Sequence, residues 1–259
     1  INPLVACQTC RDCRAGKENL CANRQIISMP PREGAFAEYV CMPDRNLVTV
    51  PDGVDLQKAA LAEPLACGWH AARLARAVLG DSFDGQSCAV IGGGAIGVGA
   101  ALSLRAQGAT TVTVIEPNAL RRETLAGIDG FDVCAPDSTG MPDAGSVDCV
   151  IDGVGYAATR ETASALARQG GVIAHIGLGE GTGGLDIRRM TLQEITFIGT
   201  YTYTPKDFVE TAEAIFDGRL GALDWIETRP LAEGQSAFTD IRAGKVAAPK
   251  IVLIPEHAD

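Results

Sequence analysis

The sequence has few of the features that mark secreted, membrane or nucleic-acid-binding proteins. It contains no run of about 18 apolar residues, and its first residues lack the basic and apolar regions of a secretory signal, so neither a membrane span nor a signal peptide is predicted. Lysine and arginine number 22 against 32 acidic residues, for a net charge of −10. Because nucleic acids and anionic membranes attract basic surfaces, neither is an expected partner.

Aromatic residues and histidines are also scarce. Only 5% of the 259 residues are aromatic, so the core is expected to consist of aliphatic side chains. Of the three histidines, His70 lies among alanines and is interpreted as a buried structural residue, while His257 lies near the terminus. No Ser-His-Asp or Cys-His arrangement of a nucleophilic enzyme is therefore predicted.

Cysteine, by contrast, is abundant, and four of the nine cysteines are clustered. Cys7, Cys10, Cys13 and Cys21 form the pattern C-x2-C-x2-C-x7-C. Zinc prefers four thiolates in a tetrahedron, so a closed, structural zinc site is favoured. An iron–sulfur cluster, disulfides and free thiols are the alternatives. Because neither a signal peptide nor a membrane span is predicted, a reducing cytoplasmic location is expected, where clustered cysteines are more typical of metal ligands than of disulfides. The other cysteines are expected to pack as small apolar residues: Cys41, Cys67, Cys88, Cys134 and Cys149.

The apolar runs predict two kinds of structure along the chain. Short β-like runs at Ala35–Val40 and Leu47–Val50 indicate a small irregular β domain, and helical spacing follows at Ala66–Ala77. Strands then alternate with helices, which predicts a parallel sheet covered on both faces. The strands are expected at Ser87–Ile91, Thr111–Ile115, Val133–Ala135, Val147–Ile151, Gly171–Ile176 and Thr196–Ile198. The helices are expected at Ile96–Gln107, Leu120–Ala126, Ala157–Arg168, Leu192–Glu194 and Pro205–Asp217, with short strands over Trp225–Pro255.

A glycine fingerprint, G-x-G-x-x-G, follows the first of these strands. It consists of Gly92, Gly94 and Gly97, with Ala95 and Ile96 inside it, and Glu116 ends the next strand. Such glycines allow a tight turn and close approach of a pyrophosphate to a helix N-terminus, and the acid binds the adenosine ribose. The alternative is an ordinary strand-to-helix turn. Glu116 would repel a 2′-phosphate and so favours NAD over NADP, although the nearby Arg121 and Arg122 weaken that preference.

Three further features are compatible with a site. The turns Gly153–Gly155 and Gly177–Gly179 each follow an apolar strand, and they are interpreted either as flanking a nicotinamide or as plain connections. Glu63 lies at an apolar helix start, where a carboxylate is either a partner of the helix dipole or an oxygen ligand of a catalytic metal.

Together, these motifs resemble the zinc-containing medium-chain alcohol dehydrogenases, within them the sorbitol (polyol) and threonine dehydrogenase branch. Further matches are the segments Gly34–Tyr39, Glu63–Leu65 and Lys250–Leu253. The resemblance implies a Rossmann doubly wound parallel sheet over residues 68–225. It also implies an incomplete GroES-like β-barrel catalytic domain over 1–67 and 226–259.

The resemblance also implies roles for single residues. The four clustered cysteines would hold a structural zinc, and Glu63 would lie near, or bind, the catalytic zinc. The fingerprint and Glu116 would bind NAD, with NADP possible, and Arg121 would flank the adenine. The segments matching those that line the nicotinamide contain Val154, Gly177 and Leu178.

The expected reaction is hydride transfer between a secondary alcohol, either a polyol or a sugar-like compound, and the nicotinamide, in a homodimer or homotetramer. Tyr201, Tyr203 and Trp225 would line the substrate pocket or pack at a subunit contact. In the family, a cysteine and a Gly-His-Glu motif upstream of the cysteine lobe bind the catalytic zinc. The chain is therefore expected to lack an N-terminal segment and to be inactive alone. The rival interpretations are a non-catalytic NAD-binding module and a zinc-independent reductase similar to quinone oxidoreductases.

Overall fold

The computed structural model describes residues 1–255, which leaves His257 outside the described part of the chain. The described chain divides into two compact units, one of residues 1–63 and 201–255 and the other of residues 64–200. The sequence-based boundaries after residues 67 and 225 differ from these joints. Helix α8 (Pro205–Phe216) packs on α2 (Leu56–Ala59), so it belongs with the first unit rather than with the sheet. Each unit is described by itself.

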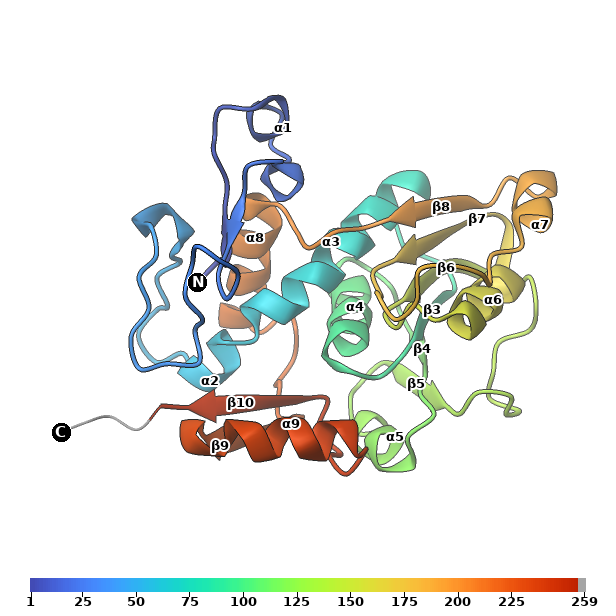
Figure 1. Cartoon of the computed structure of the whole chain (residues 1–259). Coiled ribbons are helices and arrows are strands. Elements are labelled where there is room, and N and C mark those ends of the chain that lie inside the picture. The colour runs from blue at the N-terminus through green and yellow to red at the C-terminus, as the bar shows by residue number, and fades with distance from the viewer. Residues whose placement is uncertain (256–259) are drawn as a thin grey trace. The chain divides into compact units, whose positions relative to one another are not determined.

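The second unit is built on a six-stranded, all-parallel sheet with strand order β5-β4-β3-β6-β7-β8 (Figure 1). The chain moves outward from β3 to β5 and then returns to β6 on the other side of β3, which is the doubly wound topology. This confirms the predicted Rossmann-type sheet. The strands are β3 (Cys88–Ile91), β4 (Val112–Ile115), β5 (Phe131–Cys134), β6 (Val147–Asp152), β7 (Ala167–His175) and β8 (Thr196–Gly199).

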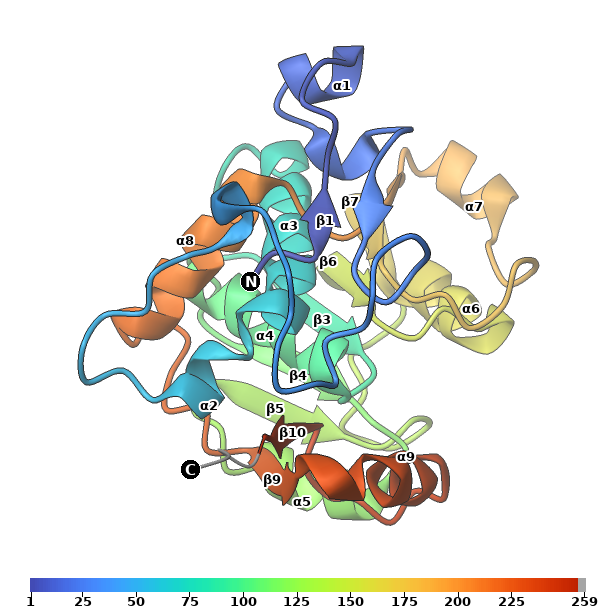
Figure 2. The same ribbon diagram turned by 60° about the vertical axis from the view of Figure 1, so that its left-hand side comes forward.

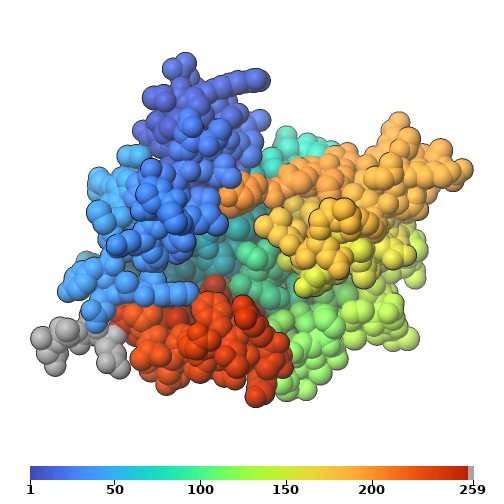
Figure 3. Space-filling model, in the orientation of Figure 1, coloured from blue at the N-terminus to red at the C-terminus, as the bar shows by residue number. Residues whose placement is uncertain are grey.

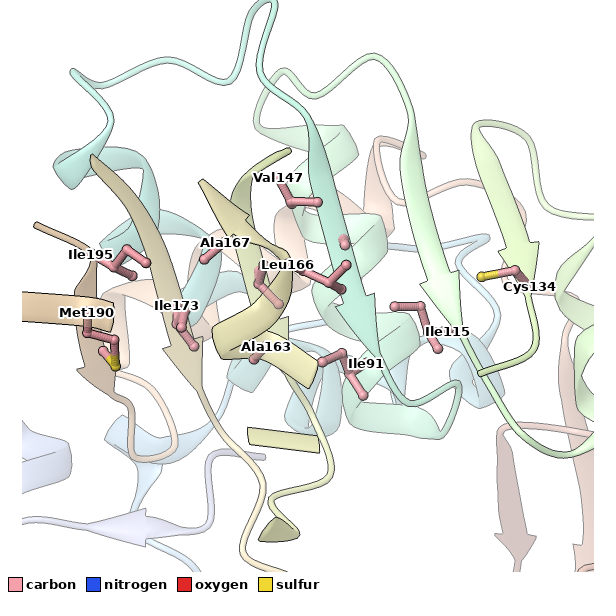
Figure 4. Packing of buried hydrophobic residues seen from close by; sticks show 12 residues of the cluster. Ile91, Ile115, Cys134, Val147, Ala163, Leu166, Ala167, Ile173, Met190 and Ile195 are labelled. Atoms are coloured by element: carbon pink, nitrogen blue, oxygen red, sulfur yellow. The ribbon is translucent and has the colours of Figure 1, made fainter. Parts of the chain in front are cut away.

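The strands form where the sequence has continuous apolar runs, because the central strands are buried on both faces. Val150 of β6 pairs with Ile173 of β7, and both are buried in one cluster with Leu166 and Ala163 (Figure 4). The helices of this unit are α3 (Ala62–Val78, which begins at the joint), α4 (Ala95–Ala106), α5 (Ala119–Leu125), α6 (Ala157–Leu166) and α7 (Ile187–Leu192).

Small residues let α3 and α4 pack closely (Figure 2). A Cβ atom added to Gly68 of α3 would lie 2.3 Å from the backbone nitrogen of Ala100 in α4. Such a contact is far inside van der Waals distance, so only glycine fits at position 68 without moving a helix. In turn, α4 packs on β3, β4 and β6, which fixes its N-terminus at the carboxyl end of β3.

The first unit contains two separate two-stranded sheets. β1 (Leu4–Val5) pairs antiparallel with β2 (Gln25–Ile26), and β9 (Ile226–Pro230) pairs in parallel with β10 (Lys250–Ile254). No barrel closes among residues 1–63 and 201–255. The helices of this unit are α1 (Arg11–Arg14), α2, α8 and α9 (Gly234–Arg242), with 3-10 turns at Glu18–Leu20, Asp44–Asn46 and Leu231–Glu233.

Several predicted elements were wrong. Ala35–Val40 and Leu47–Val50 are not strands, and Phe36 and Tyr39 are exposed, because no neighbouring strand pairs with these segments in the described chain. The stretch Trp225–Pro255 contains helix α9 between its two strands. The helix expected at Leu192–Glu194 lies earlier, at Ile187–Leu192, where the Asp186 side chain caps the first turn. None of the helices within residues 1–255 has the length and apolar character needed to span a bilayer.

Candidate functional site

The four clustered cysteines converge in a lobe formed by β1, α1 and the turn Glu18–Leu20. This N-terminal lobe, dark blue in Figure 3, lies at the molecular surface. The Sγ atoms all lie within 4.8 Å of one another, with 3.9 Å between Cys7 and Cys13 and 3.4 Å between Cys10 and Cys13. A tetrahedron with zinc–sulfur distances of 2.3 Å has edges of about 3.8 Å. The spacing of the four sulfur atoms therefore fits a tetrathiolate zinc site.

The pKa values of two of these thiols are shifted in opposite directions, as expected for a cluster of closely spaced thiols. Hydrogen bonds from the backbone and hydroxyl of Thr9 lower the pKa of Cys7 to about 5. Burial, together with hydrogen bonds from the neighbouring thiols, raises the pKa of Cys13 to about 12. Four thiolates this close cannot all carry charge without a cation between them. A divalent ion held by the four cysteines would supply that charge.

The cysteine lobe is anchored to the segment that precedes α8. Asn19 donates a hydrogen bond from Nδ2 to the carbonyl of Tyr201, at 2.8 Å. The Arg24 guanidinium lies 4.7 Å from the centre of the Tyr201 ring and donates to the carbonyl of Cys21. Loss of the metal would therefore disturb residues well beyond the four ligands.

Each glycine of the fingerprint has its own geometrical reason for lacking a side chain. Gly92 has φ +97°, which side-chain-bearing residues rarely adopt, and Gly97 lies so close to Gly92 that an added Cβ would be 1.7 Å from the Gly92 carbonyl oxygen. Gly94, at the N-cap of α4, has no heavy atom within 4 Å of such a Cβ. One glycine makes the turn, one lets helix and strand pack, and one leaves space where a pyrophosphate would approach.

A groove of about 990 Å³ runs along these glycines. Its lining includes Ala95 and Ile96 of the fingerprint, Glu116 and Arg121, and Val154 after β6, together with residues of α6 and of the loop after β5. The groove thus crosses the carboxyl ends of the strands where the sheet reverses its order, which is where doubly wound proteins bind ligands.

Glu116 directly follows β4 and is buried, with 3% of its surface exposed. Its Oε2 accepts from the backbone of Gly93 and its Oε1 from the backbone of Asn118, both at 2.7 Å. The Arg121 guanidinium lies 3.4 Å from Oε2, and the Arg121 Nε atom is buried without a hydrogen-bond partner among the described residues. The carboxylate is thus held rigidly beneath the glycine turn.

The residues predicted to line the nicotinamide lie in two loops that touch each other, one after β6 and one after β7. Only the loop after β6 reaches the groove. The Val154 side chain packs over Gly92, where an added Cβ would lie 2.5 Å from Val154 Cγ2. Gly177 touches the Val154–Gly155 backbone, and Leu178 is 88% exposed. Neither Gly177 nor Leu178 lines the groove in this structure. A direct contact of these two with the cofactor stays a prediction.

Glu63 lies in the first turn of α3, where its carboxylate accepts a 2.8 Å hydrogen bond from the Tyr203 hydroxyl. Among residues 1–255, the cysteine lobe is the one place where three or more His, Cys, Asp or Glu side chains converge closely enough to bind a metal. The structure therefore brings no second ligand set to Glu63, and its role at a metal stays a prediction. Of the aromatic residues proposed near a substrate, Tyr203 and Trp225 are buried.

Two polar residues that sequence reasoning missed lie close together at the ends of β6 and β7. Nδ1 of His175 is 3.2 Å from Oδ2 of Asp152. A signal was available, since each is a polar residue that directly follows an apolar run, Cys149–Ile151 in β6 and Val172–Ala174 in β7. His70 is buried, as predicted, and lies beside Arg73. Cys41 is exposed, so its interpretation as a packed apolar residue was wrong, because its segment is not a strand.

Comparison with known proteins agrees with this geometry. The family model described as zinc-binding dehydrogenase matches residues 95–217, and the alcohol dehydrogenase GroES-like domain matches residues 1–52. The L-galactonate-5-dehydrogenase of Escherichia coli is 34% identical over 229 residues, covering 86% of this chain. The sorbitol dehydrogenase of Bacillus subtilis is 31% identical, covering 84%. The chain belongs to the zinc-containing medium-chain alcohol dehydrogenase family.

Solved structures show the same fold. An acetophenone reductase from Geotrichum candidum in complex with NAD has a TM-score of 0.82 at 26% identity, covering 95% of this chain and 70% of that one. A zinc-binding dehydrogenase from Sinorhizobium meliloti bound to NADP has a TM-score of 0.78 at 28% identity, covering 92% of this chain and 71% of that one. The chain spans 65% of the length of the galactonate dehydrogenase and 63% of the sorbitol dehydrogenase.

Proposed function

We propose that this chain is the cofactor-binding and structural-zinc part of an NAD-dependent dehydrogenase that oxidises a secondary hydroxyl group of a polyol or sugar-like substrate, reversibly. The observation that carries the proposal is the groove over Gly92–Gly97, with an open Gly94 at a helix N-terminus and the buried Glu116 beside it. Cysteine ligation of zinc in the same chain favours this reaction over that of a zinc-independent reductase.

Each part of the groove has a task in holding the dinucleotide. The N-terminus of α4 presents backbone N–H groups and a partial positive charge to the pyrophosphate. Glu116 would accept from the adenosine ribose hydroxyls, and Arg121, which lies 3.4 Å from the Glu116 carboxylate, would flank the adenine. When bound, NAD accepts the hydride, and a catalytic zinc is a Lewis acid toward the alcohol oxygen. The chain's own contribution is to orient the nicotinamide.

NAD is the preferred cofactor in this proposal. Glu116 is buried and fixed by two backbone N–H groups, so it cannot move away from a 2′-phosphate. Arg121 is nevertheless within 3.4 Å of the carboxylate and partly neutralises it. The preference for NAD over NADP is therefore expected to be modest.

The substrate class rests on the relatives. The galactonate and sorbitol enzymes are named for compounds with several hydroxyl groups. Glu63, which accepts a hydrogen bond from Tyr203, is proposed to bind the catalytic metal or to lie next to it.

The assembly is proposed to be a homodimer or a homotetramer. The proposed location is the cytoplasm, because its reducing conditions keep the cysteine cluster in the thiolate form that binds zinc.

The test is an assay of NADH formation at 340 nm with sorbitol, xylitol and related polyols. The 259-residue chain should bind one zinc and NAD but show no turnover, since the cysteine lobe is the only multi-ligand metal site in its described part. A longer protein that also includes the residues encoded upstream of this chain in its own gene should hold a second zinc and oxidise at least one polyol. Polyol oxidation by the 259-residue chain alone would contradict the assignment of the catalytic ligands. Absence of NAD binding would refute the proposal as a whole.

A further inference from the structure

Asp152, which is buried, and His175, which is partly buried, face each other on the second half of the sheet. They occupy the same register position on the neighbouring strands β6 and β7, at the carboxyl end of each. The Asp152 side chain is fully buried, and the His175 side chain is 16% exposed. The imidazole also lies against the Phe197 ring of β8, with 5.6 Å between ring centres. A charged carboxylate without solvent requires such partners.

Asp152 shapes the turn that follows β6. Its Oδ1 accepts from the backbone N–H groups of Val154 and Gly155, at 2.9 and 3.0 Å. Its Oδ2, the oxygen nearest His175, also accepts from the hydroxyl of Thr159 in α6, at 2.9 Å. Burial alone would raise the pKa of Asp152, but these hydrogen bonds and His175 outweigh burial and lower it. The residue is therefore a carboxylate that holds a turn in place.

The turn held by Asp152 is also bound to the loop after β7. The Asp152 carbonyl accepts from the backbone of Gly177, at 3.1 Å, and the Val154 carbonyl accepts from Gly179, also at 3.1 Å. Gly155 and Gly177 approach so closely that a Cβ on Gly155 would lie 2.3 Å from the Gly177 carbonyl carbon. A shift of the 153–155 turn therefore shifts the 177–179 loop as well.

We propose that Asp152 and His175 are positioning residues for the nicotinamide half of the dinucleotide. The inference rests on the proposed function. In the proposed function Glu116 binds the adenosine and the N-terminus of α4 binds the pyrophosphate, so the nicotinamide would extend past Val154 toward the loops that follow β6 and β7. Nδ1 of His175 faces Oδ2 of Asp152 at 3.2 Å, and Asp152 holds the turn of Val154 by two hydrogen bonds. Neither residue lines the groove, so each acts through the backbone of the two loops.

The experiment compares NADH with ADP-ribose, which has the adenosine and pyrophosphate parts but no nicotinamide. His175→Phe keeps a ring against Phe197 but removes the nitrogen facing Asp152, while His175→Asn keeps a donor at that position. Calorimetry should show NADH binding to His175→Phe weakened about tenfold, with ADP-ribose within about twofold of wild type and His175→Asn largely restored. Asp152→Asn should behave like His175→Phe.

A matched control lies on the same strand as Asp152, near the opposite end of β6. Asp148 of β6 is also hydrogen-bonded, to Ser87, and Asp148→Asn should change thermal stability but neither affinity. Equal weakening of NADH and ADP-ribose by His175→Phe, or no change in either, would overturn the inference. Equal affinity of the wild-type protein for NADH and ADP-ribose would also overturn the inference, because the nicotinamide would then add nothing to binding. The proposed function as a dinucleotide-binding protein would survive that result. If wild type binds neither compound, the proposed function fails as well.

Discussion

The hydroxyl of Tyr203 donates a 2.8 Å hydrogen bond to Oε1 of Glu63, joining residues 140 positions apart in the sequence. Tyr203 is fully buried and its ring stacks on Phe208 of α8, with 5.7 Å between ring centres. Within the first unit, the bond thereby ties the segment that precedes α8 to the end of residues 1–63. This bond fixes the carboxylate to which the family resemblance gives a role near the catalytic metal.

Tyr203→Phe should retain the stacking on Phe208 but remove the hydrogen bond to Glu63. A hydrogen bond to a charged group contributes ~1.5–3 kcal/mol, and Glu63 is only partly buried, so the free energy of unfolding should fall by about 1–2 kcal/mol. Urea unfolding followed by fluorescence measures this. Phe208→Leu is the control for ring packing. A Tyr203→Phe protein as stable as wild type would show that the bond contributes nothing.

Cys10→Ser should abolish zinc binding, because three thiolates and a hydroxyl do not replace a tetrathiolate site. The expected result is loss of zinc in elemental analysis and faster hydrogen exchange over residues 5–25, with NADH affinity retained. Cys41→Ser, at an exposed cysteine outside the cluster, is the matched control and should keep its zinc. An iron–sulfur absorption band in wild type, or zinc retained by Cys10→Ser, would refute this assignment.

Glu116→Ser should narrow or reverse the preference for NADH over NADPH, because it removes the negative charge beside the 2′-phosphate and leaves Arg121 unopposed. The gain in NADPH affinity should be about tenfold, measured by titrating both cofactors. Glu123 is an exposed acid on α5, the helix that contains Arg121, so Glu123→Ser is the control and should change the affinity for neither cofactor. Wild-type protein that binds NADPH more tightly would instead show that Arg121 dominates.

Asp148 should make the fold sensitive to acid. Burial would raise its pKa, but hydrogen bonds from the Ser87 backbone and hydroxyl and the ion pair with Arg168 outweigh burial and lower it. A depressed folded-state pKa stabilises the protein above the unfolded value of about 3.9, and this contribution is lost as the pH falls through the folded value.

Asp148→Asn should therefore cost about 1–3 kcal/mol at pH 7, and its deficit relative to wild type should shrink below about pH 4. Urea unfolding of both proteins between pH 3 and pH 7 measures the difference. A deficit independent of pH would mean that the charge of Asp148 is not what stabilises the sheet.

Local pattern was sufficient for the parallel sheet and the two motifs. Central strands such as β3 and β6 are buried on both faces and so have continuous apolar runs, and the cysteine and glycine spacings are set by the geometry of a single ion and a single turn. Residues 35–40 have strand-like composition too, but a strand needs a partner, and no short window reveals one. Asp152 and His175 meet only through the register of β6 with β7. Tyr203 and Glu63, which both belong to the first unit, meet only through the tertiary structure, since 140 positions separate them in the sequence.

The most direct test of the central claim is a calorimetric titration of NADH and NADPH into the zinc-loaded protein. The groove, the open Gly94 and the fixed Glu116 predict one NADH bound per chain, more tightly than NADPH, with binding abolished by Gly94→Val because the branched side chain fills the space where the pyrophosphate approaches. No heat of binding for either cofactor, or unchanged NADH affinity in Gly94→Val, would contradict the assignment of this groove as a dinucleotide site.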